Sequence, residues 1–341
     1  MPSFEETGPR NPVTESIRVD KASPRARVFK GIRATLVIIV TIIMLIPVFV
    51  MLITTFKSRS DVVAIPPRYI PWPGAKTSVG DNSPLFNPTL EGIVFLLTER
   101  SQYTPAALVE AKANAEGLGF FDRIVLNAGQ RINGPSDFAR RLKNSLIIAG
   151  GSTIISVTLG LFAAYAFSRF EIAGKGDLLF FILSTRMLPA VVVAVPIFLM
   201  YRQLGLHDTH LGMIILYTVF NLSLTVWLLK GFIDEIPKEY EEAAMVDGYS
   251  RWQAFYKIVL PQATTGIAAT TVFAMIFTWN EYAFALLMTS EEARTAPPAI
   301  ATMLGRGGIE WSAIAAGTLA FLIPVIIIIS MGFGLLGGSD F

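Results

Sequence analysis

Long apolar runs separated by short polar segments dominate the pattern of this chain. Between Arg33 and Lys57 lie 23 residues without a charged side chain, and between Lys143 and Arg169 lie 25. A helix needs about 20 mainly apolar residues to cross the hydrocarbon core of a bilayer. The pattern therefore predicts an all-α polytopic membrane protein. Its six spans are expected at 34–56, 144–168, 178–201, 211–229, 264–289 and 311–336.

Basic residues indicate which ends of the spans face the cytoplasm. Segment 1–33 ends in a cluster of Lys and Arg beside the first span, and such clusters favour the cytoplasmic side. The connections 169–177 and 230–261 also carry Lys and Arg, whereas 202–210 and 290–310 are poorer in them. We therefore expect both termini in the cytoplasm.

The predicted spans and this orientation set the expected order of the chain. The longest connection lies outside the cytoplasm, and its basic residues are tolerated there because long translocated segments escape the charge rule. The order is a cytoplasmic tail at 1–33, a first span at 34–56, an extracytoplasmic segment at 57–143, a transmembrane core at 144–336 with the loop 230–261, and a cytoplasmic tail at 337–341.

The outer segment 57–143 combines two kinds of sequence. Its first part, 64–88, is rich in proline, which predicts extended chain. Its later part, 105–127, begins with a proline suited to a first helical turn, and Gly117 and Gly119 predict a break into two helices. The apolar residues expected to pack these helices onto the membrane-proximal surface are Leu118, Phe120, Phe121, Ile124, Val125 and Leu126.

Composition excludes several classes of function. The chain of 341 residues is 52% hydrophobic and 16% charged, which is too little charge to cover a soluble protein of this size. A net charge of +2 without a basic stripe argues against a nucleic-acid partner. The absence of cysteine excludes disulfides and thiolate sites. His207 and His210 alone are too few to hold a metal, and Gly174-Lys175-Gly176 lacks the spacing of an ATP-binding Walker motif.

One polar segment, 241–261, interrupts the apolar part of the chain, and its pattern predicts two short helices. Pro237 suits the first turn of a helix, and Gly248 suits the left-handed residue that ends it. Ser250 and Gln253 have the capping-box spacing that starts a second helix. By these properties alone, the segment either lies on the bilayer surface or projects a short helix toward a partner.

The order of residues in this segment matches a known motif. It reads Glu242-Ala243-Ala244, then Gly248 after three residues, Ile258 after nine more, and Leu260-Pro261 after one more. This is the spacing of the EAA loop, which marks the membrane subunits of bacterial ABC importers. The stretches 144–170 and 186–206 and the run FTWNEYAFAL at 277–286 also resemble carbohydrate-importer permeases of the maltose-transporter type.

This resemblance implies the fold of a type I ABC importer permease in the bacterial inner membrane, surrounded by lipid. Such a subunit pairs with a second permease, two ATPase subunits dock on its EAA loop, and an extracytoplasmic binding protein delivers a sugar. ATP and Mg²⁺ belong to the ATPase subunits, so this chain is expected to hold no cofactor and to be no enzyme. The residues implied to couple it to the ATPase are Glu242, Ala243, Ala244, Asp247, Gly248, Ile258, Leu260 and Pro261.

Two regions depart from the family pattern. Residues 99–135 look like an insertion, and the C-terminal run LLGGSDF lacks the basic residues often found there. Because of the second departure, the sequence does not indicate whether the C-terminal tail contacts the ATPase. The insertion is either a docking platform for the binding protein or a passive cap that stabilises the pair of permeases.

Several polar side chains fall within the predicted spans. A charged residue such as Arg186 is expensive there, so it is either functional or paired with a carboxylate or carbonyls. Glu281 lies beside Trp279, Asn280 and Tyr282, which together offer hydrogen-bonding groups and aromatic faces of the kind that bind sugars. Aromatic residues also anchor spans at the membrane interface, which is the alternative role here.

Three functions are compatible with these observations. The leading one is the permease subunit of a sugar importer, translocating an oligosaccharide or glycoside. The second, within the same machinery, imports a polyol or another polar osmolyte. The third is a membrane-embedded enzyme or scaffold, for which the sequence offers no catalytic motif.

Overall fold

The computed structural model describes residues 24–75, 82–305 and 308–337, so most of both expected tails lies outside it. The chain divides into two units, Met1–Val50 and Met51–Phe341. The described part of the first unit belongs to one long helix, α1 (Pro24–Thr55), which ends in the second. Its stretch Phe29–Thr55 is long and apolar enough to cross a membrane. The helix starts before the expected first span, at a proline that suits a first helical turn.

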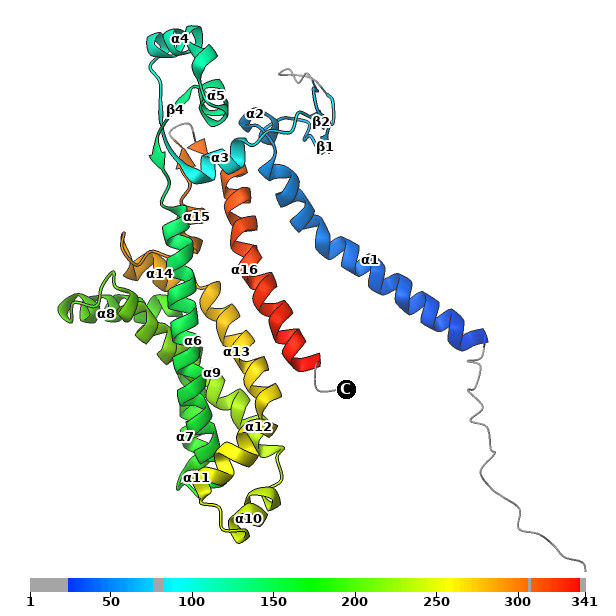
Figure 1. Cartoon of the computed structure of the whole chain (residues 1–341), viewed down its shortest axis with the longest axis vertical. Helices are drawn as coiled ribbons and strands as arrows, with labels where there is room; N and C mark the ends of the chain where they lie inside the picture. The colour runs from blue at the N-terminus through cyan, green and yellow to red at the C-terminus, as the bar shows by residue number, and fades with distance from the viewer. Residues whose placement is uncertain (1–23, 76–81, 306–307, 338–341) are drawn as a thin grey trace, which may run out of the picture. The chain divides into compact units, whose positions relative to one another are not determined.

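Four helices form the core of the second unit: α6 (Phe138–Arg169), α9 (His210–Asp234), α13 (Thr264–Trp279) and α16 (Trp311–Gly337). Figure 1 shows α6, α9 and α13 side by side, and α6 makes its most extensive contacts with α9. At their crossing, a Cβ on Gly160 would lie 2.5 Å from the hydroxyl oxygen of Thr225. That hydroxyl donates to the carbonyl of Ser156 at 3.1 Å. Glycine therefore lets the two backbones approach closely, as is common between membrane helices.

The third expected span, 178–201, consists of two helices that meet at a sharp bend. Helix α7 (Lys175–Ser184) continues as the 3₁₀ turn η2 (Thr185–Met187), and α8 (Ala190–Gln203) leaves at 90°. Pro189 stands at the break, where its ring and the restricted residue before it disfavour helix. The bend of 90° is thus much sharper than an ordinary proline kink.

The fifth expected span, 264–289, is also not continuous. Helix α13 ends at Trp279, and a separate helix α14 (Ala283–Met288) follows after three residues. A second bend of 71° separates α13 from the preceding segment Arg251–Gln262. In the described residues, four helices are long and apolar enough to span a membrane, or up to six if each bent pair counts as one span.

The outer segment contains more structure than its proline content predicts. The helical prediction for 105–127 and its break near Gly117 are confirmed, but the strands were not predicted because their sequences, TERSQ and QRINGP, lack β-branched alternation. Strands β3 and β4 pair antiparallel, while β1 and β2 pair parallel. The elements are α2 (Arg59–Val62), β1 (Ile70–Pro71), β2 (Leu85–Phe86), α3 (Glu91–Leu97), β3 (Thr98–Gln102), α4 (Pro105–Ala113), η1 (Ala115–Gly117), α5 (Phe120–Asn127) and β4 (Gln130–Pro135).

Only part of the apolar set expected to pack α5 does so. Val125 is buried against Val94 and Phe95 of α3 and Ala313 of α16. Leu126 is also buried, but Phe120 and Phe121 are 63% and 54% exposed. The expectation that all six residues pack inward is therefore wrong, because α5 is amphipathic and its first turn projects outward. Between α14 and α16 lie α15 (Ala296–Ala301), β5 (Leu304–Gly305) and β6 (Gly308–Ile309).

Candidate functional site

The polar segment 241–261 folds as two helices at one end of the second unit, opposite the end that carries α4 and α5 (Figure 1). Helix α10 (Glu239–Val246) ends before Gly248, whose φ is +92°, so the left-handed residue is confirmed. The capping box is confirmed as well. The Ser250 N–H donates to Gln253 Oε1 at 2.8 Å, and the Gln253 N–H donates to Ser250 Oγ at 3.3 Å.

Helix α10 presents two different faces. Glu241 and Ala244 are buried against the rest of the chain, whereas Glu242 and Ala243 are exposed. Val246 continues the outer face and is 88% exposed. The three residues Glu242-Ala243-Ala244 therefore do not share one face of α10, because consecutive helical residues point about 100° apart. Its first two residues are accessible to a partner, and its third packs inside.

The second half of the motif lies where the segment turns into α13. Ile258 and Leu260 are half-buried, and Pro261 is exposed beside the 71° bend. The chain passes from α11 (Arg251–Ala254) through a π-helical turn, η3 (Phe255–Val259), into α12 (Leu260–Gln262). π-Helical turns are uncommon and frequently mark functional sites.

Two residues that the motif does not include hold this turn in place. Phe255 and Val259 are buried in a cluster with Leu161 and Tyr165 of α6. The rings of Phe255 and Tyr165 lie 4.6 Å apart. Their spacing of four residues was a usable signal, since i and i+4 share one helix face.

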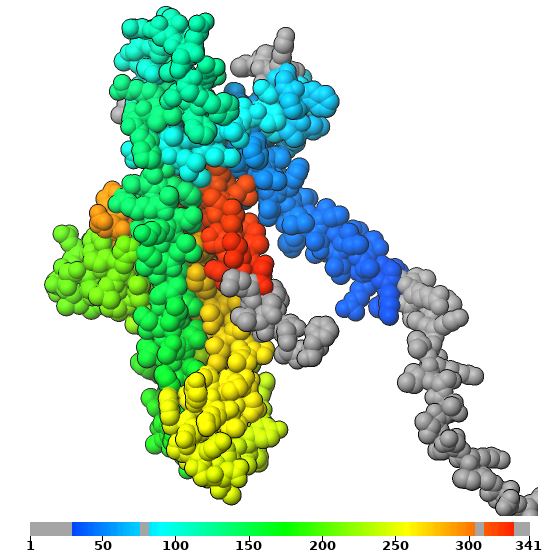
Figure 2. All heavy atoms as spheres, in the orientation of Figure 1, coloured from blue at the N-terminus to red at the C-terminus, as the bar shows by residue number. Residues whose placement is uncertain are grey.

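Exposed apolar and aromatic side chains occur on α10 and on the segment that follows it. Figure 2 shows this region, coloured yellow and yellow-green, at the lower end of the second unit. Large exposed apolar patches on a protein surface mark sites of interaction with other proteins or with a membrane. The exposed apolar and aromatic residues here are Tyr240, Val246, Tyr249, Trp252 and Tyr256.

A cavity of about 290 Å³ with a few polar groups in its lining lies between α9, the end of α13 and the break between η2 and α8. Two of the expected substrate-path residues, Arg186 and Glu281, line it together, although they belong to separate predicted spans. We call it the Arg186–Glu281 cavity. It is lined by Arg186, Leu188, Ala190, Tyr217, Phe220, Asn221, Phe277, Thr278, Glu281 and Phe284.

Hydrogen bonds fix the polar wall of this cavity. The Tyr217 hydroxyl donates to Glu281 at 2.6 Å, and the same carboxylate accepts the N–H groups of Phe284 and Ala285 at the start of α14. Asn221 donates to the Thr278 hydroxyl at 2.5 Å. Tyr217, Asn221 and Thr278 were not predicted. For Tyr217 and Asn221 the available signal was two polar side chains about one helical turn apart in a mainly apolar predicted span.

Arg186 is held by neutral groups. Its Nη1 donates to the carbonyl of Phe220 at 3.0 Å, and its guanidinium lies 4.5 Å from the centre of the Phe277 ring. The carbonyl partner was one of the two expected alternatives. Both the carbonyl and the ring face favour a cation, so the charge is stabilised without consuming a carboxylate.

The other three candidates lie outside this cavity. Trp279 is only 2% exposed, stacks on Phe321 of α16 at 4.7 Å, and donates to its carbonyl at 3.3 Å. Asn280 donates to the carbonyl of Ile276 at 2.8 Å, and Tyr282 is exposed. Residues 279–282 are adjacent in sequence but their side chains have different surroundings, because α13 ends at Trp279 and the chain changes direction before α14.

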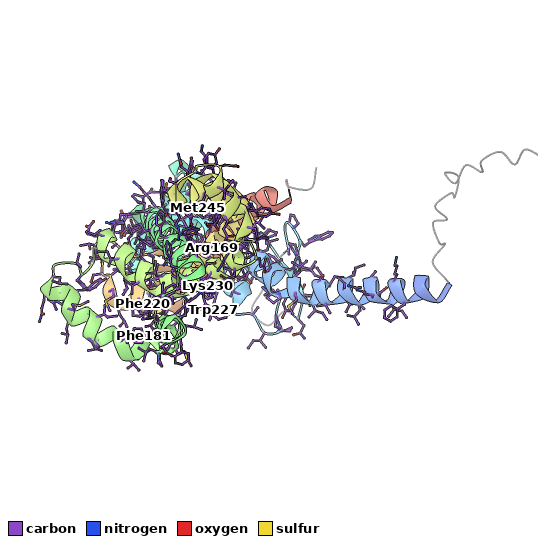
Figure 3. The ribbon with its side chains drawn as sticks, turned by 90° about the horizontal axis from the view of Figure 1, so that it is seen from below. Arg169, Phe181, Phe220, Trp227, Lys230 and Met245 are labelled. Carbon is purple, nitrogen blue, oxygen red and sulfur yellow. The ribbon has the colours of Figure 1, made fainter. Side chains whose placement is uncertain are left out.

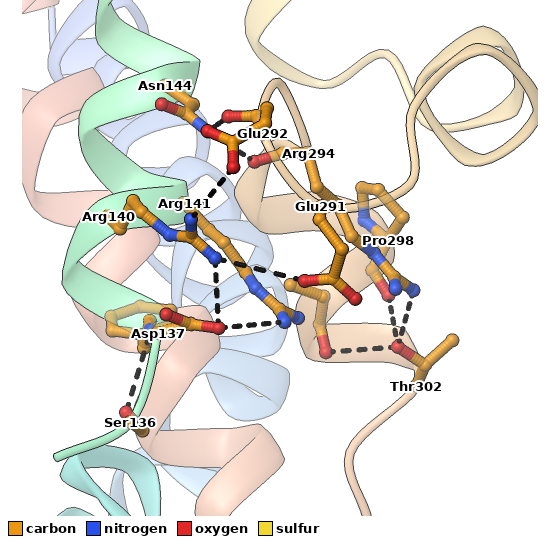
Figure 4. Close-up of polar contacts among 12 residues, drawn as sticks. Ser136, Asp137, Arg140, Arg141, Asn144, Glu291, Glu292, Arg294, Pro298 and Thr302 are labelled. Carbon is orange, nitrogen blue, oxygen red and sulfur yellow. Dashed lines mark hydrogen bonds and ion pairs between the residues drawn. The ribbon is translucent and has the colours of Figure 1, made fainter. Parts of the chain in front are cut away.

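A second polar site lies near the first residues of α6. It joins α6 to the start of α9 and to the loop 290–294. The Asn144 amide donates to the carbonyls of Glu292 and Arg294 at 2.7 and 3.0 Å, as Figure 4 shows, and its oxygen lies 2.8 Å from His210 Nε2. His210 is the first residue of α9, and its ring is hydrogen-bonded to Asn144. In the residues that the structure describes, no cluster of metal-binding side chains occurs.

Asp208 completes this site, which we call the outer clasp (Asn144, Asp208, His210 and the backbone of 290–294). Its carboxylate accepts the N–H groups of all four residues from 290 to 293, at 2.9 to 3.1 Å. Burial acts to raise the pKa of Asp208, but these four donors outweigh it, and the pKa lies below its ordinary value of 3.8. The clasp therefore contains a stably ionised carboxylate at neutral pH.

The chain is similar in sequence to known transport proteins. It is 38% identical over 195 residues to the trehalose transport system permease protein SugB of Mycobacterium tuberculosis, covering 56% of this chain and 71% of the relative. It is 32% identical over 238 residues to the trehalose/maltose transport system permease protein MalG of Thermococcus litoralis, covering 69% and 82%.

The fold agrees with these similarities. A bacterial ABC transporter involved in the import of the acidic polysaccharide alginate aligns over 94% of this chain and 99% of its own, with a TM-score of 0.58 and 19% identity. Residues 156–337, more than half of the chain, match the family model for the binding-protein-dependent transport system inner membrane component. The chain therefore belongs to this family of inner-membrane transport components and has the fold of an ABC importer permease.

Proposed function

We propose that this chain is the permease subunit of an ATP-driven importer for a sugar, delivered by an extracytoplasmic binding protein. The family match supports the transport role, and relatives named for trehalose and maltose support a carbohydrate. The same names do not favour the polyol or osmolyte alternative. A membrane-embedded enzyme or scaffold does not agree with membership of a transport family.

We infer six spans with both termini in the cytoplasm, counting each bent helix pair as one span. A second permease and two ATPase subunits complete the assembly, and the ATPase subunits hold the ATP and Mg²⁺. Because α10 and the α4–α5 region lie at opposite ends of the second unit, the ATPase and the binding protein can approach from opposite sides (Figure 1). The absence of cysteine allows a direct test. Val109→Cys should react with an impermeant thiol reagent from outside, and Glu171→Cys only after permeabilisation.

The observation that carries the coupling proposal is the exposed outer face of α10. Glu242, Ala243, Asp247 and Gly248 are accessible, so a partner surface can approach closely at the alanine and pair with the carboxylates. Pushing on this face displaces the turn at Ile258, Leu260 and Pro261, which leads into α13. Ala244 contributes by letting α10 pack closely on its own chain.

The Arg186–Glu281 cavity is the proposed solute contact of this subunit. Donors and acceptors on one wall suit the hydroxyl groups of a sugar, and the rings of Phe220, Phe277 and Phe284 suit its apolar faces. Trp279 supports this site by fixing the end of α13 against α16, whereas Asn280 and Tyr282 flank Glu281 in the chain but lie outside the cavity. A solute passing between two permeases would need only part of its surface covered by each.

Reconstitution in proteoliposomes tests the function. With both permeases, the ATPase subunits and the binding protein, uptake of labelled trehalose or maltose should require ATP and exceed uptake of glycerol or sorbitol. Glu242→Lys reverses the charge offered to the ATPase and should abolish stimulation of ATP hydrolysis by the loaded binding protein. Glu171→Lys, an exposed charge reversal outside α10, is the matched control. Full uptake by Glu242→Lys would contradict the coupling role.

A further inference from the structure

A buried ion pair joins α10 to the end of α6. The guanidinium of Arg169 pairs with the carboxylate of Glu241, and the side chains are only 6% and 7% exposed. The Tyr165 hydroxyl donates to the same carboxylate at 2.8 Å. Figure 3, viewed from this end, shows Arg169 between Met245 of α10 and Lys230 of α9. The carboxylate is therefore bound by two groups of one helix.

Arg169 also reaches the segment that leads into α10. Its Nη2 donates to the carbonyl of Ile236 at 3.0 Å, and its Nη1 donates to Ser168 Oγ at 3.0 Å. Ser168 donates in turn to Asp234 of α9 at 2.6 Å. Charged groups as buried as these are strongly destabilising when one partner is removed. The network thus holds the ends of α6 and α9 and the start of α10 in one arrangement.

The chain itself offers a less direct route from α10 to the core. Between α10 and α13 lie the turn at Gly248, the π-helical turn η3 and the 71° bend near Pro261. Each of these interruptions can absorb a displacement by changing a few backbone angles. A side-chain tie that bypasses them would transmit the same displacement with less loss.

We propose that Arg169 and Glu241 are positioning residues for energy coupling: they make α10 and the adjoining end of α6 move as one rigid body. This rests on the proposed coupling role of α10. The two adjacent glutamates then have separate tasks, with Glu242 facing the ATPase and Glu241 fastening the helix to its own chain. Motion imposed on α10 enters α6 directly, and through its extensive packing it enters α9.

Transport per ATP hydrolysed in the reconstituted complex tests this proposal. Arg169→Leu and Glu241→Gln should lower that ratio at least about fivefold, the lower end of typical couplings between sites, while assembly and basal hydrolysis persist. The exchange Arg169→Glu with Glu241→Arg should restore part of the ratio. Arg140→Leu is the matched control, because Arg140 lies on the same helix, pairs with Asp137 at 3.1 Å and is 41% exposed.

A distance measurement separates this proposal from the proposed function. Spin labels at Ile154→Cys on α6 and Lys238→Cys beside α10 should give one narrow distribution, the same with and without ATP. Arg169→Leu should broaden it, whereas Arg140→Leu should not. A narrow distribution with full coupling in Arg169→Leu would overturn the proposal, even if no sugar proves to be transported. If Arg169→Leu does not assemble, Arg169→Lys decides: restored assembly with a narrow distribution supports the ion pair, and continued failure contradicts it.

Discussion

The hydroxyl of Tyr217 on α9 donates a 2.6 Å hydrogen bond to Glu281, which caps the first turn of α14. This hydrogen bond joins the first half of α9 to the residues between α13 and α14, where the expected fifth span breaks. A hydrogen bond to a charged group contributes about 1.5–3 kcal/mol. The break at residues 280–282 is therefore a braced feature.

Tyr217→Phe should release this brace while keeping the aromatic ring. We expect slower transport and a raised KM for sugar-loaded binding protein, because the wall of the Arg186–Glu281 cavity loses a fixed donor. Tyr282→Phe removes a hydroxyl from an exposed ring outside the cavity and serves as the control. Equal uptake by both variants, measured with labelled trehalose or maltose, would argue against a solute path here.

Arg186 should tolerate lysine better than leucine. Lysine keeps a cation able to reach the Phe220 carbonyl, although it loses the flat contact with the Phe277 ring. Leucine removes the donor and leaves the cavity wall apolar. We expect uptake to fall in the order wild type, Arg186→Lys, Arg186→Leu. Wild-type uptake from both variants would make the arginine a bystander.

Gly248→Ala should destabilise the complex through backbone conformation alone. A Cβ at this position meets no atom within 4 Å, but the φ of +92° is strained for any residue that carries one. The left-handed conformation costs such residues about 1–2 kcal/mol. Gly231→Ala in helix α9 also meets no atom within 4 Å and has no positive φ, so it should leave stability unchanged or raise it by up to about 1 kcal/mol, because alanine favours a helix more than glycine does. Thermal unfolding and stimulated ATPase activity of the two variants provide the comparison.

The outer clasp should open in acid. Because the pKa of Asp208 is lowered in the folded protein, its contribution is present at pH values above the ordinary 3.8 and is lost as the pH falls through the lower folded value. Hydrogen-exchange protection of 290–293, corrected for intrinsic rates, should fall below pH 4. Asp208→Asn, which tolerates the positive φ of 56° found here, should lower protection already at pH 7. Unchanged protection in that variant would show that the carboxylate does not hold the loop.

Replacing Phe120 and Phe121 separates the two roles considered for the insertion. If the insertion docks the binding protein, the double change Phe120→Ser and Phe121→Ser should weaken stimulation of the ATPase at low binding-protein concentration and spare it at high concentration. Both rings are exposed, so folding should survive. A passive cap predicts unchanged stimulation at every concentration.

Local features of this chain were predictable from sequence, whereas contacts across the fold were not. Gly248 and the Ser250–Gln253 capping box depend on residues a few positions apart, and both are confirmed. Tyr217 and Glu281 are 64 residues apart, and Arg169 and Glu241 are 72 apart, so no spacing rule connects them. Hydropathy also located the apolar segments without showing that two of them break, because a bent pair of helices is as apolar as a straight one.

The 90° break at Pro189 has a consequence for hydration. Where a helix ends inside a membrane, its last carbonyls and the first N–H groups of the next helix lack partners within the helix. Such backbone is tolerated at that depth only where protein buries it or water reaches it. The break adjoins the cavity lined by Arg186 and Leu188, so water should wet this part of the proposed solute pathway before any solute arrives. If the solute takes this proposed pathway, the seal against ion leakage must lie elsewhere along it.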